Sequence, residues 1–224
     1  MEAEALLRLC LFLNYTEAFR LMMTVTNLSV KTRFPIVTGF TYTFEKGTIY
    51  SIIAVNGSGK TTIFRALTGL IPISSGKVEI LKQPLSKMRR SFFFYETSDW
   101  LDKHLNGLDY LRFVKTQWKS EILLTDVITK WQMSDFINLK ISKYSLGMKQ
   151  KLLIAMYIVS DADVLIFDEV NNGLDESSRK LLYSQLLSLK KAGKTIILSS
   201  HYLNDVKDIT DHMFTLKDQK LYEE

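Results

Sequence analysis

Apolar residues recur along the chain in two alternating kinds of segment. Short runs of β-branched and other apolar residues predict buried strands, and stretches with apolar residues three or four apart predict helices. The predicted strands are 24–30, 40–44, 48–54, 77–81, 92–95, 164–168 and 195–199. The predicted helices are 63–70 and 177–191, with a mostly helical region from about 100 to 160. Continuous apolar strands separated by helices indicate an α/β fold with a mostly parallel core sheet flanked by helices.

The first 22 residues differ from the rest of the chain. They are expected to form an N-terminal extension, either one amphipathic helix or a segment of undefined role, before a domain that spans residues 23–224. The apolar run 6–13 contains Arg8 and is too short to cross a bilayer. Glu2 and Glu4 argue against a signal peptide. A helix that rests on a partner or a membrane surface is the less favoured alternative.

Composition and charge narrow the class of protein. The 224 residues include 29 Lys and Arg, 24 Asp and Glu and a single Cys, Cys10. One cysteine cannot form an internal disulfide, which excludes a disulfide-rich secreted domain. The net charge of +5 is spread along the chain without a long basic run, so no nucleic acid is expected as a partner.

A glycine-containing loop stands between the strand 48–54 and the helix that follows it. Gly57 and Gly59 let the backbone curl so that several N–H groups face one point, where the start of the helix adds its dipole. Lys60 is placed to reach the β and γ phosphates of a nucleotide, and the Thr61 hydroxyl to bind Mg²⁺. The residues expected to cradle the phosphates are Ala54, Val55, Asn56, Gly57, Ser58, Gly59, Lys60, Thr61 and Thr62.

The first position of this loop departs from the usual pattern of phosphate-binding loops, which begins with Gly. Here it is Ala54. If the position needs a positive φ, alanine weakens nucleotide binding, and if it needs only a small side chain, little is lost. A chance glycine turn is the weaker interpretation, because the loop has a strand before it and a helix after it.

The second informative feature is a pair of acidic residues at the end of the apolar strand 164–168. Asp168 is expected at the carboxyl edge of the sheet, where ligands bind in open α/β folds and where it is placed to hold Mg²⁺. Glu169 follows it and points elsewhere, which suits a residue that polarises an attacking water.

The order of these motifs resembles the nucleotide-binding domain of an ABC transporter. Residues 144–150 resemble the family's signature sequence. Ser145 and Gly147 match it, and Tyr144, Leu146 and Met148 do not. Residues 172–175 resemble the D-loop, and His201, just after the strand 195–199, matches the switch histidine. The resemblance covers about residues 24–217. It implies a P-loop NTPase fold of ABC type, with an N-terminal antiparallel β subdomain and a helical subdomain at about 97–160.

The resemblance also implies roles for individual residues. Glu169 would be the base and His201 would contact the γ-phosphate and the attacking water, which makes these two the catalytic residues. Ser145 and Gly147 would touch the ATP of a second chain. Glu96 stands where the family has Gln and would join Thr61 and Asp168 at Mg²⁺. Phe34 is the aromatic residue nearest the position that stacks on adenine, although a place in the core is an equal alternative.

The partners follow from the same resemblance. The chain has no apolar stretch of about 20 residues, so the permease would be a separate transmembrane polypeptide. The chain would form a head-to-tail dimer with a second copy or a related ATP-binding subunit, at the cytoplasmic face of the cell membrane. Candidates for the permease-facing surface, with helical-subdomain core as the alternative, are Trp100, His104, Leu105 and Tyr110.

Three functions are compared on this basis. The favoured one is an ATP-hydrolysing subunit that energises an exporter. The second is a regulatory subunit that holds ATP with little or no turnover, suggested by Ala54, Glu96 and the altered signature. The third is an ABC-type ATPase acting on DNA or ribosomes, which is disfavoured because the chain has neither a long coiled coil nor a tandem domain.

Overall fold

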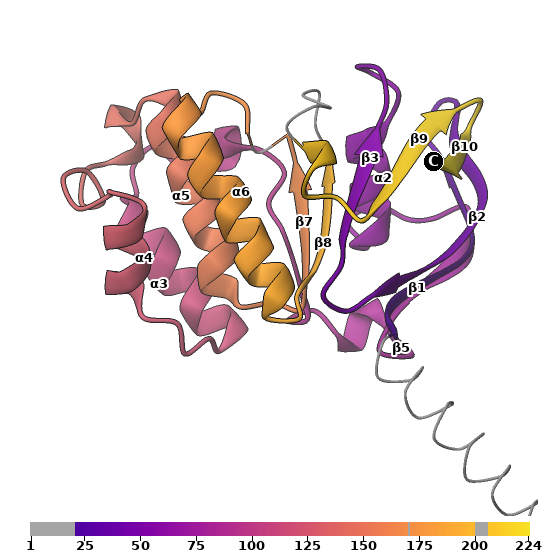
Figure 1. Cartoon of the computed structure of the whole chain (residues 1–224), viewed down its shortest axis with the longest axis horizontal. Coiled ribbons are helices and arrows are strands. Elements are labelled where there is room, and N and C mark those ends of the chain that lie inside the picture. Colours follow the sequence, from indigo (N-terminus) through magenta and orange to yellow (C-terminus); the bar gives the residue numbers. More distant parts are fainter. Residues whose placement is uncertain (1–20, 170, 200–205) are drawn as a thin grey trace, which may run out of the picture.

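The computed structural model describes residues 21–169, 171–199 and 206–224. In these parts the strands form two sheets, and Figure 1 shows a helical region on the left, a parallel sheet in the middle and an antiparallel sheet on the right. The four-stranded sheet has the order β2-β1-β4-β5 and the six-stranded sheet the order β10-β9-β3-β8-β7-β6. This confirms the predicted combination of a parallel-rich core sheet with an antiparallel subdomain.

The antiparallel sheet is built on two long strands. It comprises β1 (Leu21–Lys31), β2 (Pro35–Glu45), β4 (Ser75–Ile80) and β5 (Gln83–Pro84). Because β1 begins at Leu21, residues 21 and 22 of the expected extension are part of this sheet, and Met22 is buried. The other residues of the extension lie outside the described parts of the chain, so its helical character stays a prediction.

The second sheet places strand ends side by side at one edge. It comprises β3 (Ile49–Ile53), β6 (Phe92–Phe94), β7 (Val164–Asp168), β8 (Thr195–Ser199), β9 (His212–Lys217) and β10 (Lys220–Glu223). All neighbouring pairs are parallel except β9 with β10. The carboxyl ends of β3, β7 and β8 therefore meet at the same edge, and the loops that follow them share one site.

The helices cover the parallel sheet and form the helical subdomain. They are α2 (Lys60–Leu67), α3 (Gly107–Trp118), α4 (Leu124–Lys130), α5 (Leu146–Ser160) and α6 (Glu176–Lys191), with short 3₁₀ turns η1 (Leu85–Lys87), η2 (Ser98–Trp100) and η3 (Ile141–Lys143). Nine of the fifteen residues of α5 are buried, because α3, α4 and the sheet pack around it. None of the helices in the described ranges combines the length and apolarity needed to cross a bilayer.

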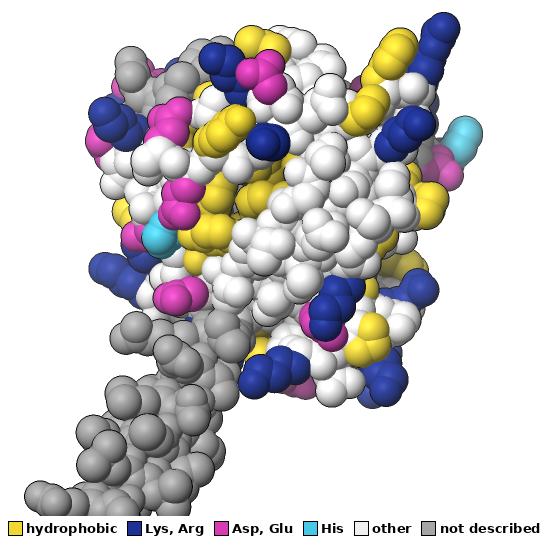
Figure 2. Space-filling view, turned by 90° about the vertical axis from the view of Figure 1, so that its right-hand side faces the viewer, with side chains coloured by type: hydrophobic (Ala, Val, Ile, Leu, Met, Phe, Trp, Pro, Cys, Tyr) yellow, Lys and Arg dark blue, Asp and Glu magenta, His cyan; other side chains and the backbone are white. Residues whose placement is uncertain are grey.

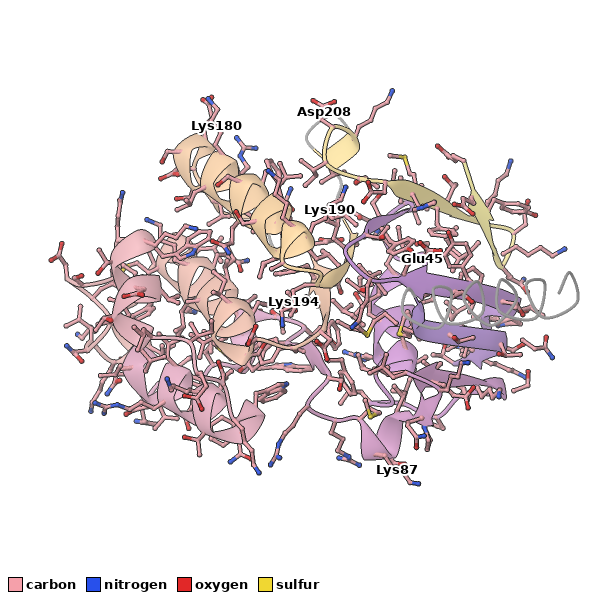
Figure 3. The ribbon with its side chains drawn as sticks, turned by 60° about the horizontal axis from the view of Figure 1, so that its bottom comes forward. Glu45, Lys87, Lys180, Lys190, Lys194 and Asp208 are labelled. Carbon is pink, nitrogen blue, oxygen red and sulfur yellow. The ribbon has the colours of Figure 1, made fainter. Side chains whose placement is uncertain are left out.

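The surface of the molecule carries both hydrophobic and basic regions. Figure 2 faces the side formed by the strands and shows hydrophobic side chains gathered beside a band of polar side chains and backbone. On this side β2 and β10 border a cavity of about 390 Å³. Figure 3 shows Lys180 and Lys190 on α6 and Lys194 just before β8, so basic residues follow the length of this outer helix.

Candidate functional site

The glycine-containing loop joins β3 to α2 and takes the expected form. Gly57 and Gly59 have φ values of 77° and 104°, in the region that favours glycine. A Cβ on Gly59 would lie 2.5 Å from a methyl carbon of Ile36, so a larger residue does not fit there. Ala54 is not among the described residues with positive φ, and alanine therefore occupies the first position without backbone strain.

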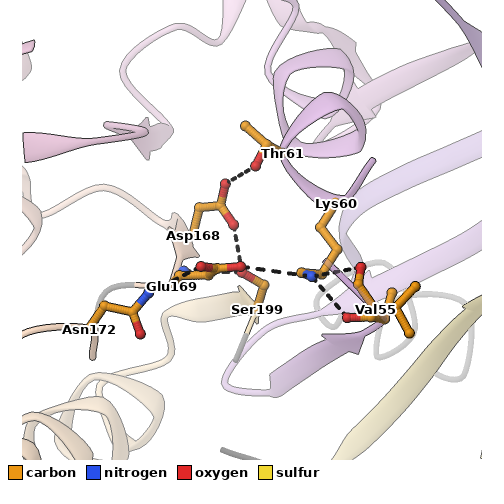
Figure 4. A network of polar contacts seen from close by, with 8 residues as sticks. Val55, Lys60, Thr61, Asp168, Glu169, Asn172 and Ser199 are labelled. Atoms are coloured by element: carbon orange, nitrogen blue, oxygen red, sulfur yellow. Dashed lines mark hydrogen bonds and ion pairs between the residues drawn. The ribbon is translucent and has the colours of Figure 1, made fainter. Parts of the chain in front are cut away.

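Lys60 reaches back into this loop from the start of α2. Its side chain is only 5 % exposed. The ammonium donates hydrogen bonds to the carbonyl oxygens of Ala54, at 2.9 Å, and Val55, at 3.4 Å. It also lies 3.8 Å from a carboxylate oxygen of Glu169, which makes it the link between the loop and the end of β7 (Figure 4). A buried cation held in this way is positioned for an anionic ligand.

Asp168 is held from two sides at the end of β7. Thr61 Oγ1 donates to one carboxylate oxygen at 2.5 Å and Ser199 Oγ to the other at 2.6 Å (Figure 4). The parallel pairing of β7 with β8 places Ser199 directly beside Asp168. Burial raises the pKa of Asp168 above its ordinary value, although the two hydrogen bonds act in the opposite direction.

Glu169 leaves the strand in a left-handed conformation, with φ of 50°. A glutamate seldom takes this conformation outside a structure that requires it. Its backbone N–H donates to Ser199 Oγ at 3.1 Å, and Asn172 Nδ2 donates to its carboxylate at 3.1 Å. The turn thereby directs the Glu169 carboxylate toward Lys60, 3.8 Å away.

Glu96 follows β6 and forms an ion pair with Arg65. Arg65, on α2, donates from Nε and Nη2 to the two carboxylate oxygens of Glu96, both at 2.5 Å. The hydrogen bond to Glu96 is the main cause that raises the pKa of Arg65. Glu96 nevertheless lines the same cavity of about 270 Å³ as Thr61 and Asp168, so the three expected metal ligands do converge.

The signature residues surround the start of α5. Ser145 is the N-cap and its hydroxyl accepts from the Met148 N–H at 3.2 Å. Leu146 is 57 % exposed and packs on Gly173, where an added Cβ would meet its Cδ2 at 2.6 Å. Ser145 and Gly147 are not among the residues that line the two cavities beside the glycine-containing loop, and their contact with the ATP of another chain stays a prediction.

A larger cavity lies on the other side of the glycine-containing loop. Its volume is about 660 Å³, and its walls include Ile36, Val55 and Ser58 together with residues 217–219. Phe34 is 66 % exposed, with the Arg33 guanidinium 5.6 Å from its ring centroid, so the alternative that places Phe34 in the core is excluded.

The candidates for a permease-facing surface divide into two groups. Trp100 and Leu105 are 50 % and 42 % exposed, and His104 is exposed as well. Tyr110 instead packs against the core of the helical subdomain, and its hydroxyl accepts from the Asp102 N–H at 2.6 Å. His201 lies outside the described residues and stays a prediction.

Sequence reasoning missed two of the groups that complete this site. Ser199 was only the last residue of a predicted strand, and its bond to Asp168 depends on the neighbouring strand. Arg65 was only a residue of a predicted helix, and no local pattern pairs it with Glu96. A polar residue at the carboxyl end of a buried parallel strand is the signal that points to Ser199.

The fold and the site together define a P-loop nucleotide-binding protein. Comparison with known proteins gives the family, because the family model described as "ABC transporter" matches residues 37–172. The chain is 36% identical over 197 residues to the uncharacterized ABC transporter ATP-binding protein YybJ of Bacillus subtilis, covering 85% of this chain and 90% of that one. It is 32% identical over 179 residues to the lantibiotic transport ATP-binding protein SrtF of Streptococcus pyogenes, covering 79% and 78%.

Solved structures agree on the fold. An ATP-binding subunit of an ABC transporter superposes with a TM-score of 0.83 at 22% identity, over 91% of this chain and 89% of that chain. The chain belongs to the ATP-binding domains of the ABC transporter family.

Proposed function

We propose that this chain is an ATP-hydrolysing subunit that energises a separate transmembrane permease, in a transporter that exports its cargo. One observation carries the proposal: Lys60, Thr61, Asp168 and Glu169 converge within one chain, joined by the contacts in Figure 4. A domain that only holds nucleotide has no need for a carboxylate directed at the phosphate-binding lysine.

Magnesium fits the groups that lie at this point. Thr61 and Asp168 offer a hydroxyl and a carboxylate oxygen within 2.5 Å of each other, and Mg²⁺ prefers a few such oxygens together with substrate phosphates. When bound, the ion would neutralise charge on the β and γ phosphates. Glu96 as a third ligand stays a prediction, because Arg65 engages both of its carboxylate oxygens.

The residues of the chain divide the reaction between them. The backbone N–H groups of the loop and Lys60 bind and orient the phosphates. Glu169 takes the proton of the attacking water, and Asn172 fixes the direction of its carboxylate through the 3.1 Å hydrogen bond. His201 is proposed to contact the γ-phosphate and the attacking water.

A second ATP-binding subunit completes the site. The proposal places Ser145 and Gly147 of one subunit against the nucleotide held by Lys60 of the other, in a head-to-tail dimer. The exposed Trp100 and Leu105 would face the permease, which would hold the dimer at the cytoplasmic face of the membrane. The export direction is supported by a relative named for Nod factor export, to which the chain is 28% identical over 191 residues.

A regulatory subunit with little or no turnover is the second candidate. It is favoured by the engagement of Glu96 with Arg65 and by the bulk of Leu146 at the signature. Such a subunit would bind ATP tightly and depend on a related, active partner.

Turnover of Mg²⁺-ATP by the purified chain tests the proposal. Lys60→Ala is expected to lower the rate by at least about 100-fold, since it removes the charge that binds the transferred phosphate. Lys180→Ala is the matched control, because Lys180 is exposed on α6 and pairs with Glu176 one helical turn away. ATP binding without turnover in the wild type would favour the regulatory subunit. An active wild type whose turnover is unchanged in Lys60→Ala would contradict the phosphate-binding role of Lys60 and with it the proposal.

A further inference from the structure

The Ser199 hydroxyl contacts two neighbouring residues of the proposed site. Ser199 ends β8 and is only 3 % exposed. Its Oγ donates a hydrogen bond to Asp168 Oδ1 at 2.6 Å (Figure 4) and accepts one from the backbone N–H of Glu169 at 3.1 Å. One buried side chain on β8 therefore holds two consecutive residues at the end of β7, the proposed metal ligand and the proposed base.

The hydrogen bond to Asp168 leaves one carboxylate oxygen for the metal. Ser199 engages Oδ1, whereas Oδ2 accepts from the Thr61 hydroxyl at 2.5 Å. Thr61 is the residue proposed to share Mg²⁺ with Asp168, so Oδ2 is the oxygen on the metal side. Ser199 is then the donor that orients the carboxylate without binding the ion itself. Hydrogen bonds of this kind fix the direction of metal-binding carboxylates.

The hydrogen bond from Glu169 holds a strained turn. Glu169 has a φ of 50°, a left-handed conformation that a glutamate keeps only where its surroundings enforce it. Ser199 fixes the backbone of this residue, and Asn172 Nδ2 fixes its carboxylate at 3.1 Å. A shift of the backbone here would move the Glu169 carboxylate from its place 3.8 Å from Lys60.

We infer that Ser199 is a positioning residue that aligns the metal-binding oxygen of Asp168 with the carboxylate of Glu169. This rests on the function proposed above. Through Asp168, Ser199 acts on the affinity for the metal, and through Glu169 it acts on the removal of the proton from the attacking water. The hydroxyl proton of Ser199 stays in its hydrogen bond to Asp168 throughout. Loss of the hydroxyl therefore changes two quantities that can be measured separately.

Metal affinity is measured without turnover in the Glu169→Gln variant. With this variant in excess over ATP, Mn²⁺ replaces Mg²⁺ and its binding to the protein–ATP complex is followed by electron paramagnetic resonance. Adding Ser199→Ala is expected to raise the Mn²⁺ dissociation constant by about 10-fold, because loss of a hydrogen bond to a metal-binding carboxylate typically costs 10–100-fold in affinity. Binding of metal-free ATP should stay within about 2-fold, since the glycine-containing loop and Lys60 are unchanged.

Turnover is measured at saturating Mg²⁺, where a weaker affinity for the metal no longer limits the rate. Ser199→Ala alone is expected to lower kcat by about 10-fold or more, with KM for ATP nearly unchanged, because the base is displaced and the ground-state contacts of the nucleotide remain. Added to Glu169→Gln, the same change should lower the residual turnover by less than about 3-fold, since the base that Ser199 positions is already absent.

Thr195→Val is the matched control. Thr195 lies at the other end of β8 and is fully buried, and its hydroxyl donates to the Glu45 carbonyl oxygen at 2.8 Å, away from the site. Each of the two changes removes one buried hydroxyl from the same strand, so both are expected to lower the melting temperature by about 2–4 °C. Only Ser199→Ala should change kcat and the Mn²⁺ dissociation constant.

The outcomes separate this inference from the proposed function. In an active enzyme, either quantity staying at its wild-type value in Ser199→Ala would overturn the inference. Equal changes in Thr195→Val would overturn it as well, because they would reflect a general weakening of β8. A wild type that binds ATP without turnover, with a Mn²⁺ affinity that depends on Ser199, would support the positioning of Asp168 and count against the proposed hydrolysis alone.

Discussion

Asp168 combines two requirements that conflict at the level of one residue. In the proposed metal site its carboxylate must be charged, yet the end of β7 is largely removed from water. Thr61 and Ser199 each donate a hydrogen bond to it, but burial still prevails and its pKa is raised. Part of the folding stability is therefore given up to keep this charge in place.

Asp168→Asn is expected to raise the melting temperature at neutral pH by about 2–4 °C, because it removes a charge that burial disfavours. A carboxyl with a raised pKa stabilises the fold below its unfolded pKa, and this contribution is lost as the pH rises through the raised value. The gain should therefore be largest at pH 7–8 and vanish in acid. Thermal unfolding across this pH range measures it, with Asp163→Asn, at a partly exposed carboxylate, as control. An equal or lower melting temperature at pH 8 would contradict the assignment.

Individual residues of the phosphate-binding loop and of the acidic strand end could be predicted from the sequence, because the residues next to them in the chain form recognisable motifs. Lys60, Thr61 and Asp168 each follow from a short motif. Arg65 and Ser199 did not, because their contacts join segments 31 residues apart. Such contacts arise from tertiary packing, which local patterns do not contain.

Single caps set the ends of the elements that carry the site. Asp175 begins α6, and its carboxylate accepts from the Ser178 N–H at 2.7 Å and from the Ser177 hydroxyl at 2.9 Å. The hydrogen bonds with Ser178 lower its pKa to about 2. The same residue closes the turn 172–175, so the cap also fixes the segment that packs on Leu146.

Asp175→Ala is expected to lower the melting temperature at pH 7 by about 2–4 °C, because the first turn of α6 loses its cap. With a lowered pKa, the contribution is present above about pH 4, the ordinary range of this carboxyl, and is lost as the pH falls through about 2. Calorimetry at pH 7 measures the effect. Asp175→Asn keeps an acceptor and should stay near wild type, and an equal loss in both variants would refute the capping role.

The pair of Arg65 with Glu96 fastens α2 to the loop after β6. A double-mutant cycle with Arg65→Gln and Glu96→Gln is expected to give a coupling free energy of about 1 kcal/mol, since the pair is bidentate but Arg65 is partly exposed. The exposed pair Lys180–Glu176 is the control and should give roughly 0.3–0.5 kcal/mol. Urea unfolding measures both cycles, and coupling no larger than in the control would mean that the pair does not join the two elements.

The elements that the sequence predicted best are the most buried ones. β7 and β8 were predicted to the residue because their apolar runs are continuous. β9 was not predicted because His212, Thr215 and Lys217 interrupt its run of apolar residues. β10 was not predicted because it is largely exposed. Helix α2 begins at Lys60, where the phosphate-binding loop requires it to start, although its apolar pattern becomes visible only at Ile63 because polar residues occupy the first turn.

For the whole molecule, the proposal requires that two subunits close over nucleotide. Glu169→Gln is expected to bind ATP without hydrolysing it, and the ATP-bound dimer should therefore persist. It should elute from gel filtration at about twice the 25.9 kDa of one chain when Mg²⁺-ATP is present. The double variant Lys60→Ala with Glu169→Gln should elute as a single chain under the same conditions. Normal hydrolysis by Glu169→Gln would remove Glu169 from its role as base.

The burial of α5 limits how this protein can diverge over evolutionary time. The same helix carries Ser145 at one end, Gln150 in the wall of the cavity that Thr61 and Asp168 line, and the central packing of the helical subdomain. A substitution that improves one of these roles is expected to disturb the other two, so few substitutions in α5 should be tolerated. Exposed positions such as Trp100 and Leu105, on the surface proposed to face the permease, do not have to serve these three tasks. Adaptation to a new membrane partner is therefore expected to accumulate there, while the helix beneath stays nearly constant.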